Sequence, residues 1–199
     1  MNAWDRFWHA PGPAHNLAVA RVILAMCACV ALAGEHPARP GALLHDVGAL
    51  PRALWEPVGL LALLRADPPS QGLVDAVGAV AVASAVTTGL GIWTRVSTAL
   101  LATSMAALLG WSQCWGRVVH DWNLVVVLWF ALALAPAGAS WSWDARGRLD
   151  PSDDGACTWG VRLLRLNVAM MWLLAGLNKV FAGGTACSAR PTSARSCTA

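Results

Sequence analysis

The sequence predicts an all-α membrane protein: a polytopic helical bundle of about five transmembrane helices plus one interfacial segment. The chain of 199 residues is 57% hydrophobic and only 13% charged, which is too apolar for an ordinary soluble domain. Its apolar residues gather in about five stretches of roughly membrane-crossing length. Many of its twelve tryptophans fall at the ends of these stretches, where indoles anchor at lipid head groups.

The chain opens with a short lead, residues 1–15. Trp4, Phe7 and Trp8 follow helical spacing, and the pattern stops at two prolines. We expect an interfacial helix here. Because no basic region leads directly into an apolar stretch with a small-residue cleavage site, the first apolar segment is interpreted as a retained span and not as a secretory signal.

The first span is predicted at residues 16–34 and contains Arg21. An arginine this near a span's end either extends to the interface or points inward as a polar partner, and both remain open. A long proline-rich loop, 35–71, follows. Within it, residues 58–65 are too short to span and are expected to lie along the interface or re-enter.

The second and third spans, 73–93 and 96–111, are predicted to form a tight antiparallel hairpin. Ala81, Ala85 and Gly89 recur every four positions in the first of these helices. This pattern lets two membrane helices approach closely, so we expect it to be a packing face. Serine and threonine hydroxyls in the third span can bond within their own helix and need no ligand.

The fourth span, 122–136, is followed by a polar connector, 137–157, which we expect to leave the membrane. His120 and Asn123 are i,i+3 neighbours at the start of this span. From the residues alone they are best interpreted as interfacial capping groups.

The fifth span, 159–181, carries Lys179, the only lysine among 14 basic residues. Arginine stays charged, whereas a desolvated lysine can lose its proton and act as a base. Gly176, Trp172 and Arg165 share its helical stripe, with Arg165 roughly 21 Å away along the axis. Lys179 is therefore either a membrane anchor near the helix end or a functional group facing protein or water.

Two blocks of sequence resemble one membrane family. The run RLLRLNVAMMWLLAGLNKV is similar to a segment of the HTTM, or vitamin K-dependent gamma-carboxylase-like, family that reads approximately R-L-x-Q-x-x-x-x-Y-x-x-A-G-x-x-K-L. Upstream, HDWNLVVVLWFALALAPAGASWSWDA resembles the family block H-x-x-N-L…P…S-x-D-A. The matching positions of the second block are His120, Asn123, Pro136, Ser142, Asp144 and Ala145.

This resemblance implies a catalytic role for Lys179 as the base that deprotonates a reduced quinone of the vitamin K type. His120 becomes a proton partner or substrate contact. Asn123 and Asp144, together with Arg165 and Trp172 of the stripe, become candidate substrate-binding residues. The implied cofactor is a lipid-soluble quinol, and no metal is expected, since the cysteine spacing suits no metal site.

The resemblance ends after Phe181. Relatives continue with an acidic-tryptophan stretch and further spans, whereas residues 182–199 have no periodic apolar pattern and are predicted to be disordered. The expected organisation is a lead (1–15), an incomplete HTTM-like domain (16–181) and a tail (182–199). A domain shortened by evolution and a coding-frame slip are both compatible with this pattern.

Three functions remain open. The chain is a quinol-directed enzyme of this family, a non-catalytic membrane protein such as an immunity, transport or assembly partner, or an inactive remnant. No P-loop, dinucleotide motif, zinc-protease motif or nucleophile elbow points to another enzyme class. The charges form no basic run, so no nucleic-acid partner is expected. The expected partners are the lipid bilayer and a quinol, and the expected location is the plasma membrane.

Overall fold

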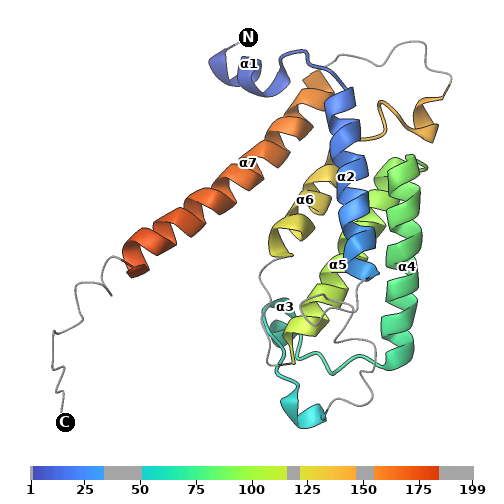
Figure 1. The fold of residues 1–199 in the computed structure, drawn as a ribbon, viewed down its shortest axis with the longest axis vertical. Coiled ribbons are helices and arrows are strands. Elements are labelled where there is room, and N and C mark those ends of the chain that lie inside the picture. Colours follow the sequence, from blue (N-terminus) through green and yellow to red (C-terminus); the bar gives the residue numbers. More distant parts are fainter. Residues whose placement is uncertain (1, 34–50, 116–121, 147–154, 184–199) are drawn as a thin grey trace, which may run out of the picture.

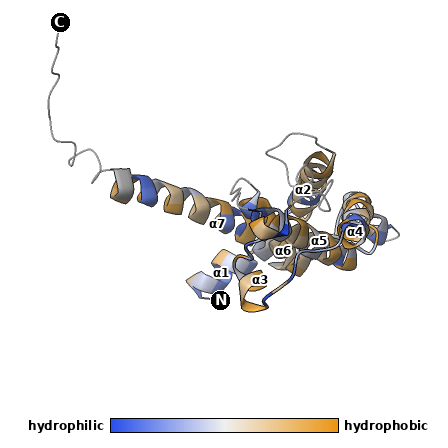
Figure 2. Ribbon diagram, turned by 90° about the horizontal axis from the view of Figure 1, so that it is seen from below, coloured by the Kyte–Doolittle hydropathy of each residue, from blue (hydrophilic) through white to orange (hydrophobic). Residues whose placement is uncertain are grey.

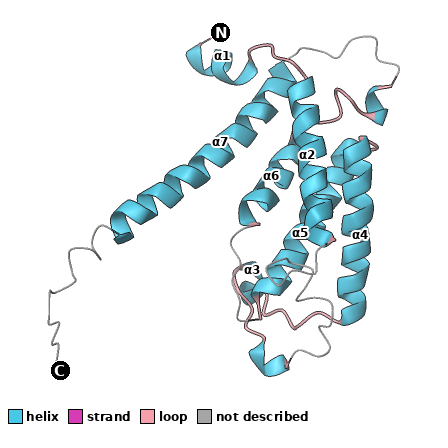
Figure 3. Ribbon diagram, viewed as in Figure 1, coloured by secondary structure: helices cyan, strands magenta, loops and turns pink. Residues whose placement is uncertain are grey.

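The computed structural model describes residues 2–33, 51–115, 122–146 and 155–183. Within these ranges every regular element is helical (Figures 1 and 3). The helices are α1 (Ala3–His9), α2 (His15–Leu32), α3 (Leu60–Leu63), α4 (Gln71–Leu90), α5 (Thr94–Gln113), α6 (Asn123–Leu134) and α7 (Gly155–Asn178), with short turns η2 (Arg52–Leu54), η3 (Trp143–Ala145) and the π-helical η4 (Lys179–Gly183). The prediction of an all-α fold is confirmed.

Four helices, α2, α4, α5 and α6, pack side by side as a bundle, and successive helices run in opposite directions (Figure 1). Helix α7 begins against this bundle and then leaves it at an angle. The lead helix α1 packs on the first turns of α7. The segments that connect the helices form the two ends of the bundle. Within the described residues, α7 is attached to the bundle only through its N-terminal part.

Three helices in the described ranges, α2, α4 and the segment Ala156–Phe181 that includes α7, are long and apolar enough to cross a membrane. Hydrophobic residues predominate along these helices (Figure 2). The structure thus has the features of an integral membrane protein. The two further predicted spans do not meet the same criteria. Helix α5 has 20 residues but contains Arg95 and several hydroxyl side chains, and α6 has only 12 residues.

The α4–α5 hairpin is as tight as predicted. Helix α4 starts at Ser70, whose Oγ accepts a hydrogen bond from the Leu73 N–H at 3.3 Å. It ends at Gly91, whose φ of 71° is a conformation that glycine adopts without strain. A Cβ on Gly91 would also lie 2.3 Å from the Cβ of Ser142, so glycine is needed for close packing as well.

Small residues bring α2 and α4 together. Ala81 and Ala85 are 0% and 1% exposed, and a Cβ placed on Gly89 would lie 3.6 Å from the Cβ of Ala25. The predicted packing face is confirmed.

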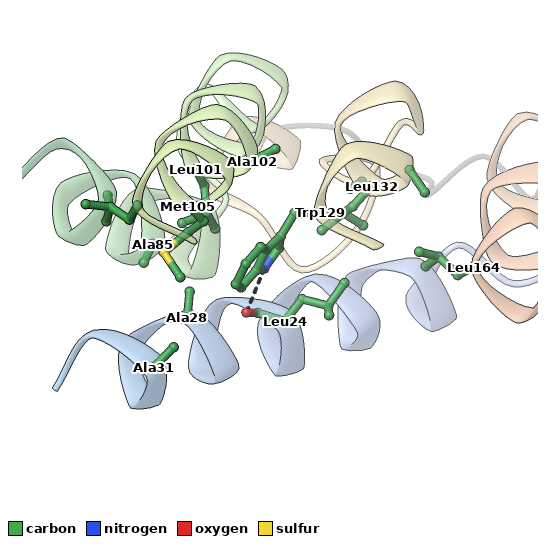
Figure 4. Close-up of a cluster of buried hydrophobic side chains, with 14 of the residues drawn as sticks. Leu24, Ala28, Ala31, Ala85, Leu101, Ala102, Met105, Trp129, Leu132 and Leu164 are labelled. Atoms are coloured by element: carbon green, nitrogen blue, oxygen red, sulfur yellow. Dashed lines mark hydrogen bonds between the residues drawn. The ribbon is translucent and has the colours of Figure 1, made fainter. Parts of the chain in front are cut away.

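The centre of the bundle is filled by Trp129, which is 0% exposed (Figure 4). Its indole N–H donates to the Leu24 carbonyl at 3.0 Å, as the dashed line in Figure 4 shows. A buried indole needs such a partner. Trp129 therefore fastens α6 to α2 by both packing and a hydrogen bond.

Helix α7 packs closely against the bundle at Gly160. A Cβ there would lie 2.6 Å from the Cβ of Ala135. The Arg162 guanidinium donates to the Arg6 carbonyl at 3.1 Å and lies 4.7 Å from the Phe7 ring centre, which ties α1 to α7. Beyond these contacts, every residue from Ala169 to Phe181 is exposed. We call Ala169–Phe181 the outer segment.

The structure agrees only in part with several predictions made from the sequence. The predicted interfacial helix is present as α1, and the short apolar stretch at 58–65 contains the single turn α3. Cys114 and Cys157 are buried, at the C-terminal end of α5 and in the first turn of α7 respectively. The tail from residue 184 onward and the loop 34–50 lie outside the described residues.

Candidate functional site

The most elaborate polar arrangement in the described structure surrounds Arg21 of α2. Its side chain is 0% exposed. One terminal nitrogen donates to the carbonyls of Ala137 at 2.6 Å and Ser140 at 3.3 Å, and the other donates to the Trp141 carbonyl. Of the two alternatives for this arginine, the structure selects the inward one.

The carbonyls that Arg21 binds belong to the connector that follows α6. A helix end leaves carbonyls without partners in the helix, and the turns after it add more. Water would satisfy them in a soluble protein, but a buried connector needs donors from the protein. The guanidinium supplies several donors in a fixed plane, so one side chain satisfies three carbonyls.

Asp144 lies on the same connector and caps helix α5. Its Oδ1 accepts from the Trp93 N–H at 3.0 Å, and its Oδ2 accepts from the Thr94 N–H at 2.7 Å and the Thr94 hydroxyl at 2.8 Å. Burial opposes ionisation, but the hydrogen bonds from Thr94 and Trp93 and the positive charge of Arg21 outweigh it. Together they place the pKa of the Asp144 carboxyl below its ordinary value.

Ser142 shapes the turn that presents Asp144. Its hydroxyl donates to the Gly138 carbonyl at 2.6 Å and accepts from the Ala145 N–H at 3.0 Å. The Asp144 N–H donates to the Gly91 carbonyl at 3.1 Å, which docks the turn on the α4–α5 hairpin. The serine, aspartate and alanine of the resembling block thus lie in one turn, and the bonds of Ser142 and Asp144 hold it in place. We call Arg21, this turn and the start of α5 the polar junction.

Hydroxyl side chains extend the polar junction into the bundle. Thr88 donates to the Ser97 hydroxyl at 3.2 Å, and Ser97 and Thr98 donate to the Thr94 carbonyl at 3.2 and 2.6 Å. Further along α5, Thr103 and Ser104 bond to carbonyls of their own helix. The prediction that the hydroxyls of this helix are satisfied internally is confirmed.

Asn123 lies at the opposite end of the bundle, as the first residue of α6. Its Oδ1 accepts a hydrogen bond from the Gln113 amide at 3.1 Å, which joins α6 to the end of α5. His120 lies outside the described residues. Asn123 and Asp144 are therefore held at opposite ends of the bundle.

The remaining candidates are distributed along α7. Arg165 is exposed and borders an apolar cavity of about 450 Å³ between α2, α6 and α7. The other residues that line it are Ala20, Ile23, Leu24, Leu128, Leu164, Val168 and Ala169. Trp172 is 74% exposed, and Lys179, the first residue of η4, is exposed as well.

The described structure does not bring the candidate residues into one site. Asp144 belongs to the polar junction, Asn123 to the opposite end, and Lys179 to the outer segment. In the described ranges, no three His, Cys, Asp or Glu side chains are grouped closely enough to hold a metal ion. Comparison of the chain with family models, with curated proteins and with solved structures found no match.

Sequence reasoning missed most partners in the polar junction. Arg21 was noticed, but Ala137, Ser140 and Trp141 bind it through backbone carbonyls, which every residue type possesses. One signal was available: Asp144 is an acidic residue in a short turn, and such residues commonly accept bonds from helix N-termini. Its partner helix begins 50 residues earlier in the chain, so local spacing did not reveal the pairing.

Proposed function

We propose that this chain is an integral membrane protein that binds other membrane helices through the outer segment of α7. The observation that carries this proposal is the continuous exposure of Ala169–Phe181, in a helix that elsewhere packs closely at Gly160. The function is assembly of a membrane complex. The bundle α2–α4–α5–α6 supplies the rigid base, and the outer segment supplies the binding surface.

The composition of the outer segment favours a protein partner over lipid alone. Trp172, Gly176 and Lys179 share one stripe on an otherwise apolar helix. A Cβ on Gly176 would meet nothing within 4 Å, so close packing inside the described structure does not require glycine at this position. Small residues let membrane helices approach, and a lysine on such a helix typically pairs with polar groups of a neighbour.

A photo-crosslinking experiment tests assembly. A photoreactive amino acid replaces Trp172 in the full chain, in native membranes, and a second variant carries it at Val86, an exposed position on α4. We expect a protein adduct from position 172 and lipid adducts from position 86. Adding Gly176→Leu should abolish the protein adduct, because the bulkier side chain separates the helices. Lipid adducts alone at position 172 would contradict the proposal.

A second candidate function rests on the identity of Lys179 as the only lysine and on the family resemblance. In this function Lys179, enclosed by the partner helices, takes a proton from the hydroxyl of a lipid-soluble quinol. The resemblance assigns His120 and Asn123 supporting roles, and Arg165 contributes a charged wall to the apolar cavity beside α7. Membership of the HTTM or gamma-carboxylase-like family is part of this proposal.

Substitution of Lys179 separates the two functions. A helix-binding lysine needs only a positive charge, so Lys179→Arg should retain the protein adduct and any cellular phenotype. A base must exist in neutral form near pH 7, which an arginine with a pKa above about 12 cannot do. Equal loss of quinol-dependent activity in Lys179→Arg and Lys179→Ala, with the adduct retained in Lys179→Arg, would establish the catalytic function.

We also propose that α5 and α6 cross the membrane beside α2, α4 and α7, giving five crossings, and that the protein resides in the plasma membrane. Helix α5 equals α4 in length, at 20 residues, and its end is bonded to the segment before α4 through Glu56 N–H and the Cys114 carbonyl at 2.8 Å. Helix α6 returns along the same bundle. Fluorescence of a tagged full chain at the cell boundary, compared with an internal-membrane marker, tests the location.

A further inference from the structure

Two adjoining cavities lie on the face of the α4–α5 hairpin. One, of about 410 Å³, lies at the end of the bundle and has a mostly apolar lining that also includes Thr94, Arg95 and Asp144. The other, of about 300 Å³, is a groove between α4 and α5, from Ile92 and Trp93 down to Val80 and Leu100. They share Trp93 and Val96, so they adjoin. We call the cavity with the charged residues the mouth, the apolar groove the stem, and the two together the depression.

The stem offers a ligand almost nothing but apolar contacts. Two of its three polar side chains bond within their own helices: the Thr87 hydroxyl donates to the Ala83 carbonyl at 2.9 Å, and the Ser97 hydroxyl donates to the Thr94 carbonyl. From Val80 to Thr87 the groove follows about 10 Å of α4, which is about a third of the hydrocarbon thickness of a bilayer. The stem therefore has room for the part of one acyl chain that lies nearest its head group.

The mouth carries both charges of a zwitterion. Arg95 is exposed, and it lines the same cavity as Asp144. Asp144 Oδ2 accepts two hydrogen bonds from described residues, whereas Oδ1 accepts only one from them, that of the Trp93 N–H. A carboxylate oxygen has two lone pairs, so Oδ1 retains one acceptor position for an outside donor.

We infer that this depression binds a phospholipid whose head group combines a phosphate with a primary ammonium group, as in phosphatidylethanolamine. The phosphate lies against the Arg95 guanidinium, the ammonium donates to Asp144 Oδ1, and one acyl chain fills the α4–α5 groove. Choline head groups lack an N–H donor, and glycerol head groups lack the cation, so neither completes both contacts. The lipid of the surrounding leaflet is the source.

The test uses the full chain purified in detergent, with thermal unfolding followed as lipid is added. Phosphatidylethanolamine, phosphatidylcholine and phosphatidylglycerol with identical acyl chains are compared. We expect the ethanolamine lipid to raise the melting temperature at about tenfold lower concentration than either of the others. Arg95→Gln and the groove-filling Ala83→Phe should remove this preference.

Both substituted residues are exposed, so the unfolding temperature without lipid should stay near that of the parent. Arg52→Gln, which removes a charge from the turn η2 near the opposite end of the bundle, and Val82→Phe, on another face of α4, are the matched controls and should keep the preference. Equal stabilisation by all three lipids would overturn the inference. So would an equal response to the ethanolamine and glycerol lipids, or a preference retained in Arg95→Gln.

Discussion

Among the described residues, Arg21 has the most consequences for the structure. It is fully buried, it comes from α2, and it satisfies three carbonyls of a connector more than 100 residues away in the sequence. Its charge also stabilises the ionised form of Asp144, which caps α5. One side chain therefore couples three helices and the connector at one end of the bundle.

Arg21→Met should destabilise the protein strongly, because methionine fills similar volume but leaves three carbonyls, two of them on buried residues, without their donors. We expect the free energy of unfolding to fall by roughly 3 kcal/mol, in line with the loss of buried bonds to a charged group. Reversible unfolding of the full chain in mixed micelles measures this. Arg52→Met, at an exposed position, serves as the control, and an equal effect of the two substitutions would contradict the structure.

Asp144 gives stability a defined dependence on pH. Its carboxyl pKa is lower in the folded protein than the ordinary value of 3.8, so the folded state favours the ionised form. This contribution is fully present above the unfolded pKa and is lost as pH falls through the lower, folded pKa. Unfolding measured from pH 7 to pH 2 should show a loss of stability below about pH 4 that is reduced in Asp144→Asn. An identical pH profile in both proteins would contradict the cap.

Helix α7 has two different halves, and two of its glycines distinguish them. At Gly160 any side chain meets Ala135 of the α6 end, while at Gly176 nothing lies within reach. Gly160→Leu should therefore detach α7 from the bundle and lower the unfolding free energy by about 2 kcal/mol or more. Gly176→Leu should leave the stability of the isolated chain unchanged. A similar loss in both variants would show that Gly176 is packed against the bundle, which would contradict the structure.

The positions of the helices could be predicted from the sequence, but the contacts between the helices could be predicted only in part. Apolar run length located α2, α4 and α7, and the spacing of Ala81, Ala85 and Gly89 identified a packing face, because only small side chains permit close approach. The departure of α7 from the bundle was not predictable. Hydrophobic residues such as Leu173 and Val180 suit lipid, a partner helix or a core equally well, so composition does not say which one covers them.

The candidate site was the least predictable feature. Lys179 stands out as the only lysine, and the resemblance adds Asp144 to the same candidate site, yet the structure holds the two on separate elements with separate surroundings. Asp144 has a clear structural task as a cap, which spacing alone did not show because its helix lies earlier in the chain. The burial of Arg21 depends on backbone carbonyl groups. Every residue has such a group, so the sequence does not indicate which carbonyls bind an arginine.

At the scale of the whole molecule, the five crossings proposed above predict that the two ends of the bundle face opposite sides of the membrane. Cys114 and Cys157 are too buried for labelling, so single cysteines at Arg52, Gln113 and Trp143 in a cysteine-free chain are preferable. Impermeant thiol reagents on oriented vesicles should label Arg52→Cys and Gln113→Cys from one side and Trp143→Cys from the other. Labelling of Gln113→Cys from the side of Trp143→Cys would remove α5 and α6 as crossings.

The pairing of Arg21 with residues 137–141 also sets an order of events during biosynthesis. The chain is made from its N-terminus, so α2 enters the bilayer when its carbonyl partners are still more than 100 residues from being synthesised. An arginine in a span costs about 2.5–3.5 kcal/mol at the membrane centre. Arg21, within roughly two turns of the start of α2, is near enough to the surface to keep its charge among head groups until then. Its move inward waits for the connector after α6, which makes closure of the polar junction one of the last steps in forming the bundle.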